Sequence, residues 1–159
     1  YEGTTAIQAN DLVGRKTARD GGQTAKSLAA QVAHTEAELA ASSSSDAQAM
    51  ARRLKDAREA FIEVVDFVAG NTKAHPNDVF AGSVPYLMLA GNLMAGWQLG
   101  RAMLVALSTE AQAQDAAFMA AKVVTARFYA DHILSKVPGI RDSIVQGAGS
   151  VTAMALEAF

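Results

Sequence analysis

PYLMLAGNLMAGWQLGRAMLVAL, residues Pro85–Leu107, is a nearly unbroken apolar segment that points to the fold class. Only Asn92, Gln98 and Arg101 interrupt it, so the helix that it predicts has apolar or small residues on all sides. Such a helix lies either in the core of a helical protein or in a membrane. Because an arginine near the centre of a bilayer costs about 2.5 kcal/mol or more, we favour a central core helix over a membrane span.

The segments on either side of this helix have the spacing of amphipathic helices. Apolar residues recur every three or four positions over about 4–16, 24–41, 47–69 and 110–136. We expect breaks at Gly21-Gly22, the serine run 42–45, Gly70-Asn71 and Pro138-Gly139, with Ser45 or Asp46 capping the third helix. Residues 140–159 leave room for one last short helix.

The predicted fold is all-α, an antiparallel bundle of about four long helices plus a short N-terminal helix. Only three prolines occur and alternating β-branched runs are absent, which disfavours a sheet. The expected core residues are Ile7, Leu12, Val13, Leu28, Val32, Leu39, Met50, Leu54, Phe61, Val64, Val65, Val68, Phe118, Met119, Val123, Val124, Phe128, Ile133 and Leu134.

Composition limits the classes of function. The chain has 159 residues, half of them hydrophobic, a net charge of -2 and no cysteine. These values predict a globular domain without disulfides or cysteine-ligated metals, and they favour neither nucleic acid nor an anionic membrane as a partner. No charged segment followed by an apolar run occurs at the start, so we expect no signal peptide and a cytoplasmic location.

The histidines and carboxylates do not predict a metal site. His34 and Glu38 are spaced to share a helix face, but no Glu-x-x-His pair of the kind used in di-iron bundles occurs. Asp131 and His132 are adjacent, so their side chains point in different directions on a helix. We therefore expect no bound metal.

Two arginines lie in apolar helical segments and need partners there. An unpaired buried charge is costly, so Arg101 and Arg127 are each expected to form an ion pair, with Asp131 four residues from Arg127 as one candidate. The aromatic residues at helical spacing near them are interpreted as core: Trp97, Phe118, Phe128 and Tyr129.

The start of the chain carries a motif. Tyr1-Glu2-Gly3-Thr4, followed by Ile7-Gln8 and Val13-Gly14-Arg15-Lys16, resembles the acyl-CoA dehydrogenase family. The resemblance lies in the order of all three elements, since the tripeptide EGT alone is common. It implies an FAD enzyme in which Glu2 is the catalytic base that removes the α-proton of an acyl-CoA. A desolvated carboxylate has a raised pKa, which strengthens it as a base.

The same resemblance implies roles for the next four residues. Gly3 would lie beside the acyl group of the substrate, and Thr4 would contact the flavin, with Thr5 and Ala6 close by. The alternative for Glu2 is a solvated residue before a helix, where a negative charge is mildly favourable.

From about Gln23 onward the chain resembles the extra C-terminal domain of a larger subclass of these enzymes, which includes 3-methylmercaptopropionyl-CoA dehydrogenases. This resemblance rests on Pro85–Leu87, Gly96–Gly100 and Lys122–Ala130. It implies that residues 1–22 end the catalytic C-terminal domain and that residues 23–159 form an additional helical bundle. We then expect further dehydrogenase domains upstream of Tyr1.

Two hypotheses of function follow. In the first, the chain is the C-terminal portion of an FAD-dependent acyl-CoA dehydrogenase that uses an acyl-CoA substrate and an electron acceptor and forms a homo-oligomer. The fragment by itself is then expected to bind no cofactor and to be inactive. In the second, the chain is a non-catalytic helical module for interaction or oligomerisation. The sequence preceding Tyr1 distinguishes the two.

Overall fold

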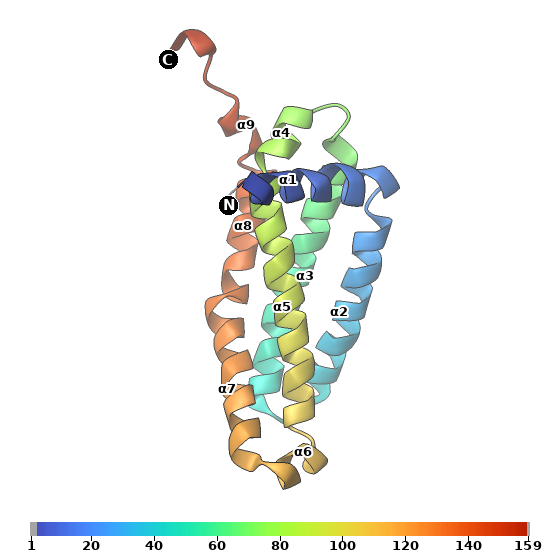
Figure 1. Ribbon diagram of the computed structural model, residues 1–159, viewed down its shortest axis with the longest axis vertical. Helices are drawn as coiled ribbons and strands as arrows, with labels where there is room; N and C mark the ends of the chain where they lie inside the picture. Colours follow the sequence, from blue (N-terminus) through green and yellow to red (C-terminus); the bar gives the residue numbers. More distant parts are fainter. Residues whose placement is uncertain (1–2, 159) are drawn as a thin grey trace. The chain divides into compact units, whose positions relative to one another are not determined.

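A computed structural model describes residues 3–158, and within this range all regular secondary structure is helical (Figure 1). The predicted all-α class is therefore confirmed. The elements in chain order are α1 Gly3–Asp11, η1 Leu12–Thr17, η2 Ala18–Asp20, α2 Gln23–Ala41, α3 Ser45–Asn71, α4 Pro76–Ala81, α5 Ser83–Ala106, α6 Thr109–Gln114, α7 Ala116–His132, η3 Leu134–Lys136, α8 Val137–Val145, α9 Ala148–Val151 and η4 Leu156–Ala158.

The chain forms two compact units, whose boundary falls inside α2, α3 and α5 and after the first residue of α8. Unit 1 comprises Tyr1–Ala29, Ala60–Ala90 and Pro138–Phe159, and unit 2 comprises Ala30–Glu59 and Gly91–Val137. Each unit is described by itself below.

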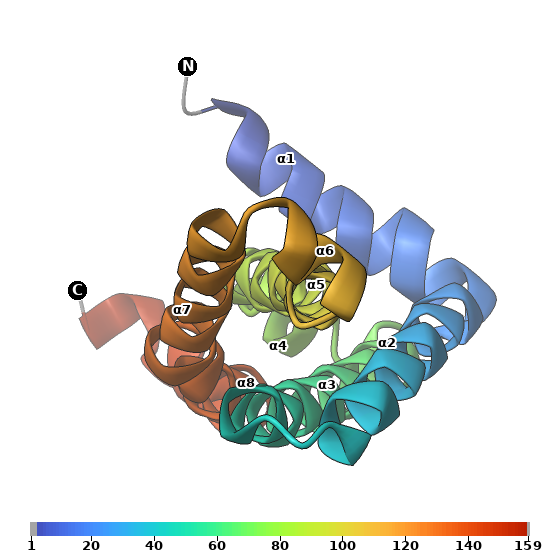
Figure 2. The same cartoon turned by 90° about the horizontal axis from the view of Figure 1, so that it is seen from below.

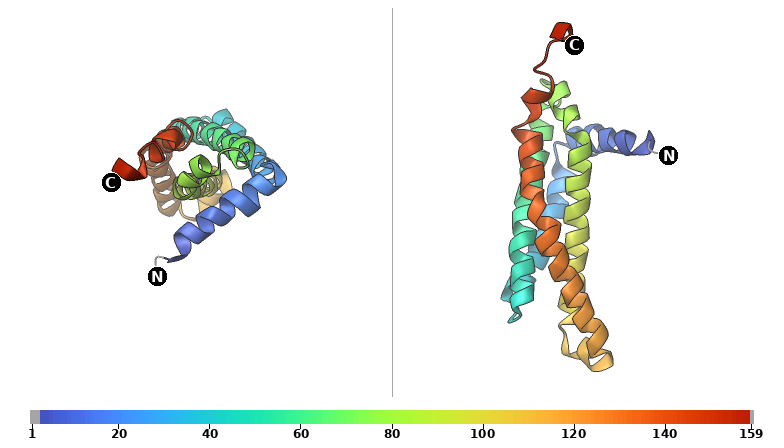
Figure 3. Two further views of the ribbon diagram at one scale, coloured as in Figure 1. Left: turned by 90° about the horizontal axis from the view of Figure 1, so that it is seen from above. Right: turned by 90° about the vertical axis from the view of Figure 1, so that its left-hand side faces the viewer.

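In unit 1, the N-terminal segment α1–η1 extends sideways from the start of α5 (Figure 3). It packs through one side, on which Ala9, Val13 and Thr17 are buried. The rest of this core comes from the C-terminal half of α3, the start of α5, and α8, and comprises Phe61, Val64, Val65, Val68, Tyr86, Leu89 and Ile144. Ile7, which we expected in the core, is exposed, because α1 has only this one side against the unit.

In unit 2, α6 lies over the end of α5, with α7 on one side of it and α2 on the other (Figure 2). Leu93 and Met103 of α5 are fully buried, as expected for a central core helix, and Trp97 is half-buried. Two glycines allow neighbouring helices to approach α5 closely. A Cβ at Gly96 would lie 2.7 Å from Leu134 Cδ2, and one at Gly100 would lie 3.0 Å from Leu39 Cδ1.

Two predicted helix boundaries in the C-terminal third are wrong. The segment 110–136 is interrupted at Asp115, which leaves helical geometry (φ -156, ψ 87) and caps α7 by accepting from Phe118 N at 3.0 Å. Pro138-Gly139 does not stop a helix, because α8 begins at Val137. Proline lacks an N–H group, but the first turn of a helix has no partner for it, so Pro138 is tolerated there.

The cap of α3 also differs from expectation, and a short helix follows α3. The cap is Ser44, whose Oγ accepts from Ala47 N at 3.4 Å, and not Ser45 or Asp46, which lie inside the helix. After the break at Gly70-Asn71, the segment that starts at Pro76 forms the short helix α4, with the proline in its first turn.

Several predicted core residues are exposed, chiefly on α7. Phe118, Val124 and Phe128 face outward, as does Leu28 of α2. The buried side of α7 contains Val123, Ala126 and Ala130. Small and apolar residues occur all round this helix, so the sequence pattern does not select the packed side. Among the described residues, no helix has both the length and the apolar character needed to cross a membrane.

Candidate functional site

Four of the five residues predicted to form the dehydrogenase site lie together at the start of α1. Gly3, Thr4, Thr5 and Ala6 occupy consecutive positions, and all four are exposed. Glu2, the predicted base, lies outside the described residues. Around Gly3 there is open space, since an added Cβ would meet nothing within 4 Å. The first amides of a helix have no intrahelical acceptor, so this end of α1 offers donors as well as threonine hydroxyls.

The helix that carries these residues is held to unit 1 through its second half. The VGRK part of the motif lies in the π-helix η1, a geometry that is often found at functional sites. Val13 is fully buried, whereas Arg15 is exposed and pairs with Asp11 one turn earlier. The hydrogen bond with the Asp11 carboxylate raises the pKa of Arg15.

The end of η1 is fixed by a buried hydrogen bond. Thr17 Oγ1 lies 3.0 Å from the hydroxyl oxygen of Tyr86 on α5, and both residues are buried. The Tyr86 ring packs against Phe61 with centroids 6.1 Å apart. Burial raises the pKa of Tyr86, and the hydrogen bond with Thr17 partly opposes that shift.

Replacing Tyr86 by phenylalanine tests this contact. The change leaves the Thr17 hydroxyl without its partner, and an unsatisfied buried hydroxyl costs about 1–3 kcal/mol, so the free energy of unfolding should fall at neutral pH. Because the folded-state pKa of Tyr86 is raised, its contribution is complete below the unfolded tyrosine pKa, about 10. That contribution is lost as pH rises through the folded value.

The measurement is urea unfolding between pH 7 and pH 11. The unsubstituted chain should lose stability above about pH 10, and the Y86F chain should lose less over the same range. Tyr129→Phe is the comparison: burial also raises the pKa of Tyr129, but this residue is only half-buried and donates a longer bond, 3.3 Å, to the carbonyl of Asn92. Y129F should therefore reduce the alkaline loss less than Y86F does. If the unsubstituted chain and Y86F lose equal amounts of unfolding free energy at alkaline pH, Tyr86 is not the group responsible.

Unit 2 contains an open groove between α2 and α5, with a volume of about 960 Å³. Its lining is Ala30, Gln31, His34, Thr35 and Glu38 from α2, and Trp97, Gln98, Arg101, Ala102, Leu104 and Val105 from α5.

Polar contacts fix the walls of this groove. The indole Nε1 of Trp97 donates to Thr35 Oγ1 at 2.8 Å, which links α5 to α2. His34 Nε2 and Glu38 Oε1 lie 3.7 Å apart, so the prediction that they share a helix face is confirmed. The sequence did not reveal the Trp97–Thr35 contact, because it joins residues that are far apart in the chain.

The two arginines noted in the sequence have different environments. Arg127 pairs with Asp131 at 2.7 Å, as predicted, and with Asp46 at 2.8 Å. The hydrogen bond with Asp131 is the main cause of its raised pKa. Arg101 is exposed, donates to Gln98 Oε1 at 2.9 Å and lies over the Trp97 ring. The ion pair expected for Arg101 is absent among residues 3–158, because this side chain reaches solvent and needs no buried counter-charge.

A protein family described as acetyl-CoA dehydrogenase C-terminal like matches residues 24–155 of the chain. The match covers most of α2 and continues past α9. It contains the groove and both arginines, whereas the exposed motif at the start of α1 lies before it.

Two relatives are acyl-CoA dehydrogenases. The chain is 50% identical over 134 residues to 3-methylmercaptopropionyl-CoA dehydrogenase of Ruegeria pomeroyi, covering 84% of this chain and 23% of that protein. It is 32% identical over 165 residues to the broad-specificity linear acyl-CoA dehydrogenase FadE5 of Mycobacterium tuberculosis, covering 91% of this chain and 25% of that protein. The chain thus spans about a quarter of the length of each relative. The matches extend over most of the chain, and it belongs to the acetyl-CoA dehydrogenase C-terminal-like family of the acyl-CoA dehydrogenases.

Proposed function

We propose that the chain is the C-terminal portion of an FAD-dependent acyl-CoA dehydrogenase. Residues 1–22 then complete the catalytic domain, and residues 23–159 form the additional helical bundle. The observation that carries the proposal is the 50% identity to a 3-methylmercaptopropionyl-CoA dehydrogenase over most of the chain. Because the chain corresponds to only a quarter of that enzyme, the activity belongs to a longer parent protein.

In the parent, Glu2 accepts the α-proton of the acyl-CoA thioester. When FAD is bound, it supplies the acceptor for the hydride that leaves the β-carbon, so a carbon–carbon double bond forms between the two positions. The residues after Glu2 suit such a site: the space around Gly3 is open, and the hydroxyls of Thr4 and Thr5 are exposed. Ala6 brings no polar group, so its proposed role is proximity to the cofactor. The electrons then leave to an external acceptor.

The substrate class proposed for the parent is an acyl-CoA. Among acyl groups, 3-methylmercaptopropionyl-CoA is the first to test, because the relative that carries that name shares half of its aligned residues with this chain. A linear acyl-CoA is the natural comparison, given the second relative.

The fragment should bind no flavin and reduce no acceptor. Most of a dehydrogenase of the relatives' size lies outside it, and four of its proposed site residues, Gly3 to Ala6, are exposed at one helix end. Purified fragment should lack a flavin absorption band and should not reduce an acceptor dye when an acyl-CoA is added. The parent, assayed alongside, should be yellow and active. A yellow fragment with stoichiometric FAD would contradict this prediction, and a colourless, inactive parent would contradict the proposed function.

The second candidate function is a non-catalytic module for interaction or oligomerisation. The specific observation in its favour is the set of large apolar side chains that α7 exposes, among them Phe118 and Phe128. The two candidate functions are compatible, since a domain that belongs to an enzyme can also bind another protein or another subunit.

A further inference from the structure

The helix that carries the proposed site residues is anchored at one end only. We call α1 and η1 together, Gly3–Thr17, the motif helix. Its buried residues are Ala9, Val13 and Thr17, whereas residues 3–8 are all exposed. The second half of the motif helix is therefore packed against unit 1, and the proposed site residues lie on the free half.

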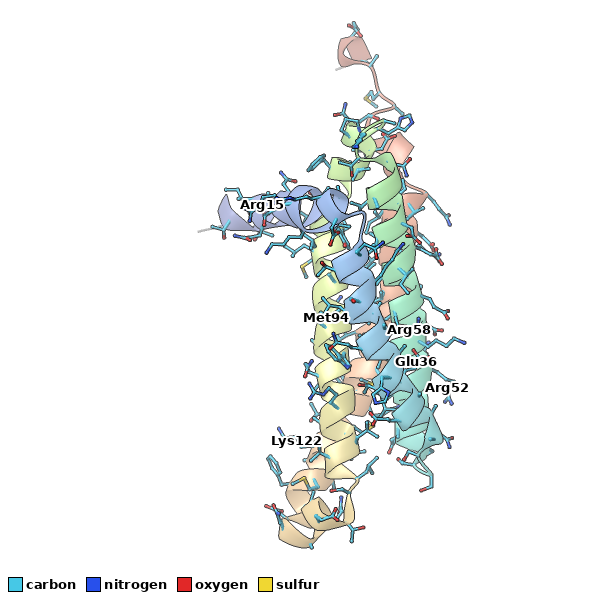
Figure 4. All side chains as sticks on the ribbon, turned by 90° about the vertical axis from the view of Figure 1, so that its right-hand side faces the viewer. Arg15, Glu36, Arg52, Arg58, Met94 and Lys122 are labelled. Atoms are coloured by element: carbon cyan, nitrogen blue, oxygen red, sulfur yellow. The ribbon has the colours of Figure 1, made fainter. Side chains whose placement is uncertain are left out.

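The π geometry of η1 keeps the buried residues on one side of the motif helix. In an α-helix, residues four apart are rotated by about 40° relative to each other, so repeated steps of four wind round the axis. The wider turn of a π-helix opposes this rotation. Val13 and Thr17 are both buried, and Arg15 between them is exposed. In Figure 4 the segment labelled at Arg15 extends sideways from the rest of unit 1.

The surface that receives the motif helix includes residues 60–90. Thr17 Oγ1 lies 3.0 Å from the Tyr86 hydroxyl oxygen, and a Cβ at Gly14 would lie 4.0 Å from Phe80 Cζ. The motif helix and residues 60–90 belong to the same compact unit. The proposed function assigns them to different domains, the motif helix to the end of the catalytic domain and residues 60–90 to the additional bundle. The catalytic motif thus depends on the bundle for its support.

A single directional contact joins the motif helix to the bundle. Among residues 3–158, no hydrogen bond other than that between Thr17 and Tyr86 joins the motif helix to α2 or any later helix. Both residues are buried, and the Tyr86 ring is held against Phe61. Apolar side chains slide past one another at little cost, whereas a hydrogen bond weakens steeply when its angle changes. The Thr17–Tyr86 contact therefore fixes the rotation and the tilt of the motif helix.

A small change at the anchored end is amplified at the free end. The motif helix is about 20 Å long, so a tilt of about 3° at Thr17 moves its first turn by about 1 Å. A misplacement of about 1 Å in a reacting group can cost about 10²-fold in rate. A residue that contacts only Thr17 can therefore control the geometry of the site.

We propose that Tyr86 is a positioning residue for the dehydrogenase reaction: through Thr17 it sets the direction of the motif helix and hence the place of Glu2. The inference rests on the proposed function, in which Glu2 is the base. Tyr86 acts through Thr17 and is not itself a catalytic residue. The additional bundle then takes part in the reaction by orienting the helix that follows the base.

The test compares substitutions at this contact in the parent enzyme. Thr17→Val and Tyr86→Phe each remove one partner, T17V/Y86F removes both, and Thr17→Ser keeps a hydroxyl. Reduction of the flavin is followed by anaerobic mixing with saturating 3-methylmercaptopropionyl-CoA. The first three variants should reduce the flavin at least about tenfold more slowly than the unsubstituted parent. T17S should stay within about twofold of it, because its hydroxyl can bond Tyr86. FAD content and substrate affinity should be unchanged in all four.

The double variant separates positioning from stability. Each single substitution that removes a hydroxyl leaves the other one buried and unpaired, which lowers the urea concentration at which the protein unfolds. Replacing both partners by apolar groups is nearly neutral for stability. T17V/Y86F should therefore unfold at a urea concentration close to that of the unsubstituted parent, while its flavin reduction stays slow. A contact with only a structural role would let both quantities recover together.

Hydrogen exchange measures the anchoring of the motif helix directly. Loss of the anchor should loosen α1, so its amides should exchange at least about tenfold faster in T17V/Y86F than in T17S. Tyr129→Phe is the control, because it removes a tyrosine hydrogen bond to α5 that lies in unit 2. It should change neither the exchange of α1 nor the rate of flavin reduction.

Normal flavin reduction in T17V/Y86F, or recovery of its rate together with its stability, would overturn the proposal. So would unchanged exchange in α1, or an equal slowing by Tyr129→Phe. Each of these results would leave the proposed function standing, since the unsubstituted parent is active in all of them. An unsubstituted parent that oxidises no acyl-CoA would instead overturn the proposed function, and this inference with it.

Discussion

Replacing Glu2 by glutamine in the parent enzyme should slow reduction of the flavin by substrate about 10²–10⁴-fold, the usual contribution of a general base. Glutamine keeps the shape of the side chain and removes the basic carboxylate, so the α-proton has no acceptor. The loss corresponds to about 3–5 kcal/mol of activation free energy. Flavin content and acyl-CoA affinity should be retained, since neither depends on this negative charge.

The measurement is anaerobic mixing of the E2Q parent with acyl-CoA while the flavin absorption band is followed. Glu59→Gln is a suitable control, because Glu59 is an exposed carboxylate of α3 whose neighbours are Lys55 and Arg58. It should leave the rate of bleaching unchanged. If the band of E2Q bleaches at the normal rate, the base is a residue upstream of Tyr1. The family assignment would stand, and this chain would hold no catalytic carboxylate.

The second large effect is expected at the joint between the motif helix and α2. Gly22 has a positive φ of 81°, and a Cβ there would lie 2.5 Å from Cγ1 of Val65, which is fully buried. Gly22→Ala therefore adds a steric clash of about 1–3 kcal/mol to a left-handed strain of about 1–2 kcal/mol. We expect the free energy of unfolding to fall by a total of about 2–5 kcal/mol.

Gly21 is the matched control for this change. It also has a positive φ, 65°, but a Cβ there would meet nothing within 4 Å. Gly21→Ala should cost only the backbone strain, about 1–2 kcal/mol. Urea unfolding of both variants measures the difference. Equal losses would show that Val65 moves aside and that the close approach in unit 1 is not required for stability.

At this joint the position of the turn is easier to predict than the hydrogen bonds that stabilise it. Residue type alone predicts a break at Gly21-Gly22, since glycine adopts the left-handed conformation at low cost. The bonds that hold the turn were not predictable. Gly22 N donates to Asp20 Oδ1 at 2.9 Å and lies 2.9 Å from the carbonyl oxygen of Thr17.

The bonds from Gly22 N and from Thr24 also lower the pKa of Asp20, and the side chain of Thr24 is the largest contributor. A carboxylate with a lowered pKa stabilises the folded state above its unfolded pKa and loses that contribution as pH falls. The turn should therefore loosen in acid.

The sequence by itself determined the helical class, the core position of the helix over residues 85–107, and the family. Each depends on composition or on residues close together in the chain. The long apolar segment indicates the central helix, and the order of the elements in the N-terminal motif indicates the family. The site residues Glu2, Gly3, Thr4, Thr5 and Ala6 remain predictions.

Tertiary structure alone decided which side of α7 is buried, because an apolar and alanine-rich helix carries no pattern that distinguishes its sides. It also decided the partners of Tyr86, Trp97 and Arg127, since Thr17, Thr35 and Asp46 come from distant positions. Such contacts exist only once helices pack, and packing depends on the shape of the whole surface rather than on local spacing. The exposed Phe118 and Phe128 have the same origin. Small residues such as Ala126 and Ala130 fill the packed side of α7 at close approach, which leaves the large rings outside.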